Sequence, residues 1–307
     1  MNSAQNTRRY LGKRTKLTDT CCEHRDLPQT MGSKQQAIVV EVLAALDADQ
    51  LDLPVLPEMV FKIQELRDDP NSSNDQFVEL ISTDLALSLY LIKAANSAAF
   101  FSGQRVGSLQ EAIPRLGHRM LYSMVMNLTL TKLFIATSPL IKQKLKELWA
   151  RSRIVAANCY VLAQKKRYLK PEDAMLAGLV CEIGALPLYL YADRHHPELD
   201  PESLDTLIST FSSPISFRLL QSWNFPDAII DVVADKMNMR GVVQSDRADY
   251  VDVVMMANLQ AQTDTQRVAW TNVFAAERLG CYPGDCKNFF INNAKYFEET
   301  NGMLNIA

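Results

Sequence analysis

The chain has 307 residues, of which 48% are hydrophobic and 22% charged, an ordinary globular composition with room for one large or two ordinary domains. A formal net charge of −3 excludes a chain-wide field that would recruit nucleic acid or an anionic membrane. Glycine is scarce, with 11 residues, and alternating strand patterns between Asn-Gly or Asp-Gly turns are absent. Long helices are therefore expected.

Residues 1–33 are polar and carry six basic against three acidic residues, so we predict a basic, disordered tail. Its segment Cys21-Cys22-Glu23-His24 offers metal-ligating side chains. Adjacent ligands without a second spaced pair do not close a tetrahedral site, so a metal site there is the lesser alternative. No apolar signal-peptide segment and no apolar run of about 18 residues occurs, so we expect no membrane span and a cytoplasmic protein with reduced thiols.

From residue 34 one amphipathic helix follows another, and the first carries an apolar stripe between Ile38 and Leu46. Several helix starts are marked by capping residues or by a proline in the first turn. In chain order these are Pro57, the Ser73–Gln76 capping box, Thr83 or Asp84, and the Ser108–Glu111 box. Pro114 is expected to kink or shorten its helix, and a long helix follows to about Leu133.

Ser138-Pro139 marks a seam, after which a second set of helices begins near Lys142. Pro171 and Pro226 open two later helices, and Gly184 is a helix stop or a tight crossing. Two more helices are expected over about 247–262 and 266–279. The fold class is therefore all-α, in two closely packed lobes. We predict a tail over 1–33, lobes over 34–140 and 141–280, and a C-terminal extension over 281–307.

Short segments along both lobes occur in an order and spacing that resemble the HDOD family, a branch of the HD phosphohydrolase superfamily found mainly in bacterial regulatory proteins. They cover about residues 45–280 and imply an HD-like helical bundle. These segments are Leu53-Pro54-x-Leu56-Pro57, Ile81-Ser82-Thr83-Asp84-Leu85-Ala86-Leu87, Ala94-Ala95-Asn96-Ser97-Ala98, Ser108-Leu109-x-Glu111-Ala112-Ile113, Arg115-Leu116-Gly117, Leu148-Trp149-x-x-Ser152, Ala177-Gly178-Leu179, Ile183-Gly184-x-Leu186, Trp223-x-x-Pro226 and Met256-Ala257-Asn258.

The resemblance also implies where a metal site would lie. HD enzymes hold one or two divalent ions with a first His, a His-Asp pair and a final Asp. In this chain the first His position falls on Arg151, the pair on Cys181-Glu182 and the final Asp on Asn258. Only Glu182 remains a good ligand, because Arg151 is a cation and Asn258 a weak neutral donor. We therefore predict no metal, no cofactor and no catalytic residue at this degenerate site.

Two further interpretations concern this site. Arg151 and Glu182 could pair in a bidentate fork that replaces the ion as an electrostatic tie between helices. The alternative is an unusual metal centre that uses Cys181 and Glu182. Either way, Arg151, Cys181, Glu182 and Asn258 are the predicted positions of a pocket for a ligand or partner.

Other polar groups have both a structural and a functional interpretation. Asn96-Ser97, after an apolar helix, is expected to cap that helix, with a binding role as the alternative. His195-His196 precedes Pro197 at a helix end, where capping is favoured over metal binding. The basic run at Lys165-Lys166-Arg167 complements a helix dipole and does not require nucleic acid.

The leading hypothesis is a non-catalytic module of bacterial signal transduction, implied by the family resemblance, that binds a regulatory protein partner or a small nucleotide-type ligand. The second hypothesis is a divalent-metal phosphohydrolase that acts on nucleotides or cyclic dinucleotides. A third is a protein that binds cyclic dinucleotides without hydrolysing them.

Overall fold

The computed structural model describes residues 41, 44, 53–133, 136–235, 247–261, 274–280 and 292–305, and every regular element in this part of the chain is helical. The all-α prediction is confirmed. The predicted tail over 1–33, with its Cys21–His24 segment, lies outside the described residues. The helices are α4 (Glu58–Asp68), α5 (Asn74–Ile81), α6 (Leu85–Ala95), α7 (Leu109–Leu116), α8 (His118–Leu133), α9 (Pro139–Ala163), α10 (Pro171–Val180), α11 (Ala185–His195), α12 (Pro201–Ser222), α13 (Asp227–Asp235), α14 (Tyr250–Ala261), α15 (Phe274–Leu279) and α17 (Ala294–Leu304).

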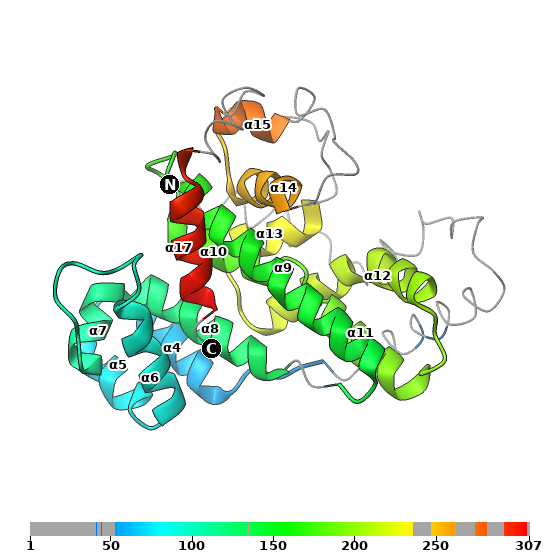
Figure 1. The fold of residues 1–307 in the computed structure, drawn as a ribbon, viewed down its shortest axis with the longest axis horizontal. Helices are drawn as coiled ribbons and strands as arrows, with labels where there is room; N and C mark the ends of the chain where they lie inside the picture. The colour runs from blue at the N-terminus through cyan, green and yellow to red at the C-terminus, as the bar shows by residue number, and fades with distance from the viewer. Residues whose placement is uncertain are drawn as a thin grey trace.

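Helices α4 to α8 form one group, which lies at one end of the molecule in Figure 1. Local capping explains where several of them begin. The Ser73 amide donates to the Gln76 side chain at 2.7 Å, and the Asp84 carboxylate accepts from the Leu87 amide at 3.0 Å. These contacts satisfy backbone donors that the first helical turn leaves free. The Ser73–Gln76 capping box is confirmed, and of Thr83 and Asp84 the second is the cap.

Helix α9 follows this group along the chain and packs against α10, α11, α14 and α17, while α8 of the first group packs against α10 (Figure 1). It begins at Pro139, three residues before the predicted start, because Ser138 accepts from the Ile141 amide and the proline needs no amide partner in the first turn. Its 25 residues bury side chains on several faces. Helix α9 is therefore the axis around which α10, α11, α14 and α17 pack.

Two glycines at very close helix contacts flank the turn between α10 and α11: Gly178 lies in the last part of α10, and Gly184 ends the turn. A Cβ atom at Gly178 would lie 2.8 Å from the Cys159 Sγ and 2.9 Å from the Ala156 Cα, both on α9. A Cβ at Gly184 would overlap the Ser212 carbonyl oxygen and the Ser216 amide nitrogen of α12. The Gly184 amide also donates to the Ser216 Oγ at 2.8 Å. Gly184 is therefore a tight crossing, and the turn is clamped between α9 and α12.

The cap at the end of α12 joins this helix to the first helical group, α4 to α8. Asn224 adopts the left-handed conformation, with φ of 53°, which asparagine tolerates better than most residues. Its carbonyl oxygen accepts from the Gln64 Nε2 at 2.7 Å, and Tyr122 donates to the Gln64 Oε1 at 3.1 Å. The Trp223 indole donates to the Pro54 carbonyl oxygen at 3.2 Å. The Trp223–Pro226 segment thus fixes α12 to α4 and α8.

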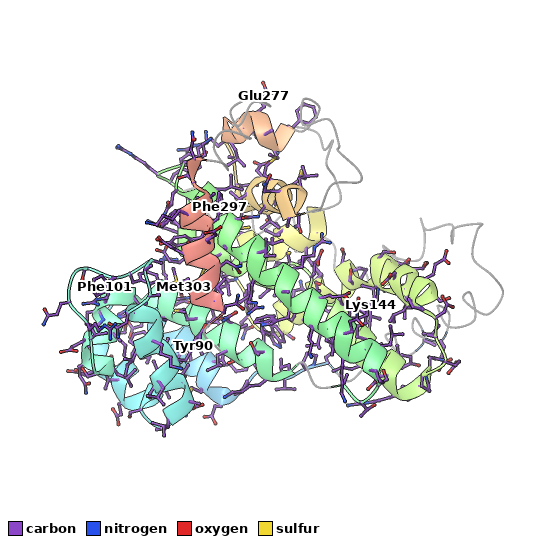
Figure 2. All side chains as sticks on the ribbon, in the orientation of Figure 1. Tyr90, Phe101, Lys144, Glu277, Phe297 and Met303 are labelled. Atoms are coloured by element: carbon purple, nitrogen blue, oxygen red, sulfur yellow. The ribbon has the colours of Figure 1, made fainter. Side chains whose placement is uncertain are left out.

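The last described helix, α17, returns to the first group across α9 (Figures 1 and 2). Asn127 of α8 is fully buried, and its Nδ2 donates to the Tyr90 hydroxyl at 2.6 Å and to the Leu304 carbonyl oxygen at 3.0 Å. The amide therefore joins the C-terminal extension to the first group. Arg153 of α9 adds a contact to Asn305.

The stretch Pro171–His195 is long and apolar enough to cross a membrane by composition alone. It is divided into α10 and α11 by the turn at 181–184, and 83% of its most apolar window is buried inside the protein. Buried core helices have this composition because water is excluded on all sides. The stretch is therefore part of the core.

We expect Gly184→Ala to lower the free energy of unfolding by about 3 kcal/mol or more, because the Ser212 carbonyl cannot retreat without moving α12. Gly178→Ala should cost about 1–3 kcal/mol, because the Cys159 thiol can adjust but the Ala156 backbone of α9 must shift by a few tenths of an ångström. The matched control is Gly302→Ala in α17, where nothing lies within 4 Å of the added methyl group and a gain of about 0.5–1 kcal/mol is expected. Urea denaturation followed by circular dichroism measures all three; equal effects would contradict the clamp.

Asp193 of α11 anchors the segment before α9. Its carboxylate accepts from the Thr137 amide and hydroxyl, both at 2.7 Å, and from the Ser138 amide at 2.9 Å. Partial burial raises the pKa of this carboxyl, but the donors of Ser138 and Thr137 outweigh it and lower the pKa from 3.8 to about 2. The ionised form is therefore the one that the fold stabilises.

We expect the ionised Asp193 carboxylate to contribute fully to the free energy of unfolding above pH 4. This contribution is lost as the pH falls from about 4 towards 2, because the pKa of Asp193 is lower in the folded state. Asp193→Asn should cost about 1–3 kcal/mol at neutral pH and flatten the stability profile in that acid range. Asp69→Asn is the control, because an amide oxygen can still accept from the Asn71 amide. If the free energy of unfolding of Asp193→Asn fell as steeply between pH 4 and 2 as that of the wild type, this role of Asp193 would be refuted.

Candidate functional site

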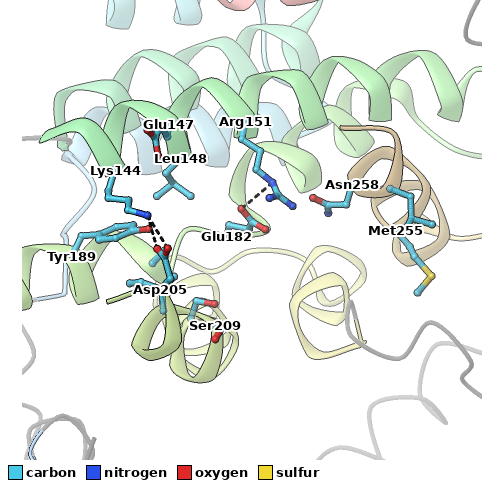
Figure 3. Close-up of a pocket in the computed structure, with 14 residues that line it drawn as sticks. Lys144, Glu147, Leu148, Arg151, Glu182, Tyr189, Asp205, Ser209, Met255 and Asn258 are labelled. Atoms are coloured by element: carbon cyan, nitrogen blue, oxygen red, sulfur yellow. Dashed lines mark hydrogen bonds and ion pairs between the residues drawn. The ribbon is translucent and has the colours of Figure 1, made fainter. Parts of the chain in front are cut away.

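A cavity of about 410 Å³ opens where α9, α11, α12 and α14 meet (Figure 3). The clamped turn supplies Glu182, and a single face of α9 supplies four side chains at the spacing i, i+3, i+4 and i+7. The lining residues are Lys144, Glu147, Leu148, Arg151, Glu182, Ala185, Tyr189, Asp205, Ile208, Ser209, Ser212, Met255, Asn258 and Leu259.

Three of the four residues predicted for the degenerate site line this cavity together. Arg151 comes from α9, Glu182 from the turn and Asn258 from α14 (Figure 3). Cys181 does not line it, because its side chain is only 1% exposed. The Cys181 thiol donates to the Gly178 carbonyl oxygen at 3.3 Å and lies 3.9 Å from the Asn258 Nδ2. The thiol thus belongs to the packed floor of the site.

Arg151 and Glu182 form an ion pair, as the sequence suggests, but the pair is not a bidentate fork. The Arg151 Nε lies 3.7 Å from the Glu182 Oε2, beyond hydrogen-bond distance. The two side chains are 41% and 22% exposed. A partly exposed pair of this kind contributes at most about 1 kcal/mol. The pair is therefore too weak to hold the helices together. The close contacts at Gly178 and Gly184 hold them instead.

The donor set in the cavity does not fit a divalent ion. Arg151 brings a positive charge to the position of a metal ligand, and the thiol of Cys181 is buried and bonded to a backbone carbonyl. Asn258 offers one neutral oxygen, and Glu182 is the remaining carboxylate of the predicted set. Among the described residues no group of three or more His, Cys, Asp or Glu side chains is placed to hold a metal. Common metal sites need more competent donors.

The far end of the cavity holds charged residues that the sequence analysis did not single out. Lys144 Nζ contacts both oxygens of Asp205, at 2.7 and 2.9 Å. Glu147 accepts from the Gln143 side chain at 2.9 Å. Burial raises the pKa of Tyr189 to about 12, assisted by the negative charges of Asp205, Glu182 and Glu147. The helical spacing of Lys144, Glu147, Leu148 and Arg151 is the sequence signal that could have revealed this end.

Asn96 and Ser97 lie away from the cavity. Asn96 ends α6, and its amide donates to the carbonyl oxygens of Ile92 and Val106 at 3.0 and 2.8 Å. Its Oδ1 accepts from the Val106 amide at 2.9 Å. These bonds use the whole amide to hold the loop that follows α6, in agreement with the structural interpretation. The Ser97 hydroxyl is buried and has no hydrogen-bond partner among the described residues.

The described histidines also lie outside the cavity lining. His195 ends α11 and His196 caps it, with the His196 amide donating to the Ala192 carbonyl oxygen at 2.9 Å. His196 Nε2 lies 3.3 Å from a Glu41 oxygen and its Nδ1 lies 3.5 Å from a Glu198 oxygen. The expected position at a helix end is confirmed for both residues.

Comparison with known families decides which fold family this arrangement belongs to. Residues 53–239 match the HDOD domain, which is more than half of the chain. The chain belongs to the HDOD family. The matched range includes Arg151, Cys181 and Glu182 of the degenerate site, whereas Asn258 lies beyond its end.

Among solved structures, this HDOD protein is similar to a "Putative metal-dependent phosphohydrolase" from Shewanella amazonensis, with 28% identity and a TM-score of 0.75 over 89% of this chain and all of the other. An HDOD domain protein of unknown function from Geobacter sulfurreducens shares the fold, at 19% identity and a TM-score of 0.64 over 89% of this chain and 97% of the other. A curated relative, an uncharacterised protein of Treponema pallidum, is 29% identical over 64% of this chain. That match spans 40% of the relative's length.

The strength of the Arg151–Glu182 pair can be measured with a double-mutant cycle of Arg151→Gln and Glu182→Gln. We expect a coupling energy below about 1 kcal/mol, because solvent screens the pair. Arg278→Gln is the comparison, since Arg278 pairs with the fully buried Asp252 and its loss should cost about 3–5 kcal/mol. Urea denaturation gives each free-energy change. A coupling energy between Arg151 and Glu182 as large as the cost of Arg278→Gln would show that the pair holds the helices together.

Proposed function

We propose that this HDOD protein is a non-catalytic regulatory module of bacterial signal transduction that acts by binding a protein partner or a small ligand. The observation that supports this most directly is the Arg151 guanidinium in the cavity beside Glu182, where the described residues bring together no competent set of metal donors. A guanidinium stays charged at any physiological pH and repels a divalent cation. In this proposal the cavity binds a protein partner or a small ligand.

We also propose how the chain is divided and where it is located. We place the boundary between the two lobes near residues 140 and 141, at the start of α9, and leave 281–307 as an extension that includes α17. A cytoplasmic location suits Cys159 and Cys181, which form no disulfide in the described part of the chain.

A metal-dependent phosphohydrolase is the second candidate. Two observations favour it: the Glu182 carboxylate is kept in the cavity, and the Shewanella structure at 28% identity is named for that activity. This candidate needs donors that the described residues of the cavity do not bring together, because Arg151 and Asn258 replace two of them. We therefore rank it second.

The two candidates differ in metal content and turnover. Protein purified without an affinity tag should contain well below one Mn, Fe or Zn ion per chain and should not hydrolyse cyclic di-GMP. Elemental analysis and a phosphodiesterase assay with added Mn²⁺ measure both. A stoichiometric metal together with turnover that Glu182→Ala abolishes would overturn the proposal. Glu202→Ala, on the exposed start of α12, is the control that should change neither quantity.

A further inference from the structure

The charges around the cavity restrict what it can bind. Among the described residues that line the cavity, two cations, Lys144 and Arg151, lie with three carboxylates, those of Glu147, Glu182 and Asp205. Each cation already has a carboxylate contact, at 2.7 Å for Lys144 and 3.7 Å for Arg151. The excess of negative charge also acts on Tyr189. A phosphate group would therefore meet net repulsion, whereas a neutral, zwitterionic or cationic molecule would not.

Glu147 and Arg151 line the cavity from the same helix and carry opposite charges, so one can bind a cationic group and the other an anionic group. They lie four residues apart on α9, the spacing at which Glu and Arg side chains commonly pair with each other. Arg151 contacts Glu182 instead, and Glu147 accepts a hydrogen bond from the uncharged Gln143 side chain. The Arg151 Nε has no hydrogen-bond partner among the described residues. The cavity is thus lined by a guanidinium and a carboxylate whose Cα atoms lie about 6 Å apart along the helix axis.

Between these charged groups the walls are apolar. Leu148 projects from α9 between the Lys144–Asp205 pair and the Arg151–Glu182 pair (Figure 3). Ile208, Met255 and Leu259 complete this lining from α12 and α14. A cavity of about 410 Å³ lies within the usual range of small-molecule sites, in which an apolar body is held by a few polar groups.

We propose that this cavity binds a small zwitterion with an apolar body, an amino acid or short peptide, whose carboxylate pairs with Arg151 and whose ammonium group pairs with Glu147 and the exposed edge of Asp205. The apolar body packs against Leu148 and Ile208. The inference rests on the proposed regulatory function, for which it supplies the class of ligand. Guanidinium–carboxylate pairing gives orientation, because the planar donors match both carboxylate oxygens.

The test uses the whole chain and seven defined probes in calorimetry and thermal unfolding. At least one of L-leucine, L-phenylalanine and L-leucyl-glycine should raise the unfolding temperature by roughly 3 °C at ten times its dissociation constant. N-acetyl-L-leucine lacks the ammonium group and L-leucine methyl ester lacks the carboxylate, so each should bind at least about tenfold more weakly than the parent zwitterion. Inorganic phosphate and cyclic di-GMP should not bind.

Variants locate the site. Glu147→Gln and Arg151→Gln should each weaken zwitterion binding at least about tenfold, the effect of losing one charge-assisted contact. Glu147 is exposed, so its substitution should leave the unfolding temperature of the unliganded chain unchanged. Lys146→Gln, on the exposed face of the same helix, is the control and should bind as the wild type does.

Absence of binding by all three zwitterions, or binding unaffected by Glu147→Gln, would overturn the inference. Binding of cyclic di-GMP that Arg151→Gln abolishes would also overturn it, while leaving the proposed regulatory function in place. Metal-dependent turnover would instead refute the proposed function, and it is measured in a separate assay. The two failures are therefore distinguishable.

Discussion

The close approach of three helices around the turn that carries Glu182 is the constraint on which this structure depends. Gly178 brings α10 against α9, and Gly184 brings the turn against the backbone of α12. Neither contact leaves room for a side chain, so close helix packing fixes the position of the turn. The side chains that line the cavity can therefore change without loss of the fold. This explains how a chain of the HDOD family can carry Arg151 and Asn258 at positions where the resemblance predicts metal ligands.

The same constraint explains why the helices around the cavity need no electrostatic tie to hold them. The Arg151–Glu182 pair is partly exposed and separated by 3.7 Å, so it adds little to stability. Its importance lies in the charge pattern that it creates with Lys144, Asp205 and Glu147. An arginine held by one loose contact is suited to recognition, because a ligand need not break a strong existing pair to reach it.

How far the sequence predicts this structure depends on the range of the interactions involved. Caps such as Ser73 and Asp84 act within four residues, so the starts of their helices are predictable. The family resemblance placed Arg151, Glu182 and Asn258 at one site, and the structure brings them together. The pairing of Lys144 with Asp205 spans 61 residues, and no local pattern encodes it. For the same reason the buried bond from Asn127 to Leu304 could not be predicted.

That bond also affects when the chain can complete its fold during synthesis. Asn127 and Leu304 are 177 residues apart, and at about 5–20 residues per second the acceptor is made roughly 9–35 seconds after the donor. Until then the Asn127 amide can donate to Tyr90 but lacks its second acceptor, Leu304. A buried donor left unsatisfied costs about 1–3 kcal/mol. The first group therefore gains this contact only after α17 has been synthesised.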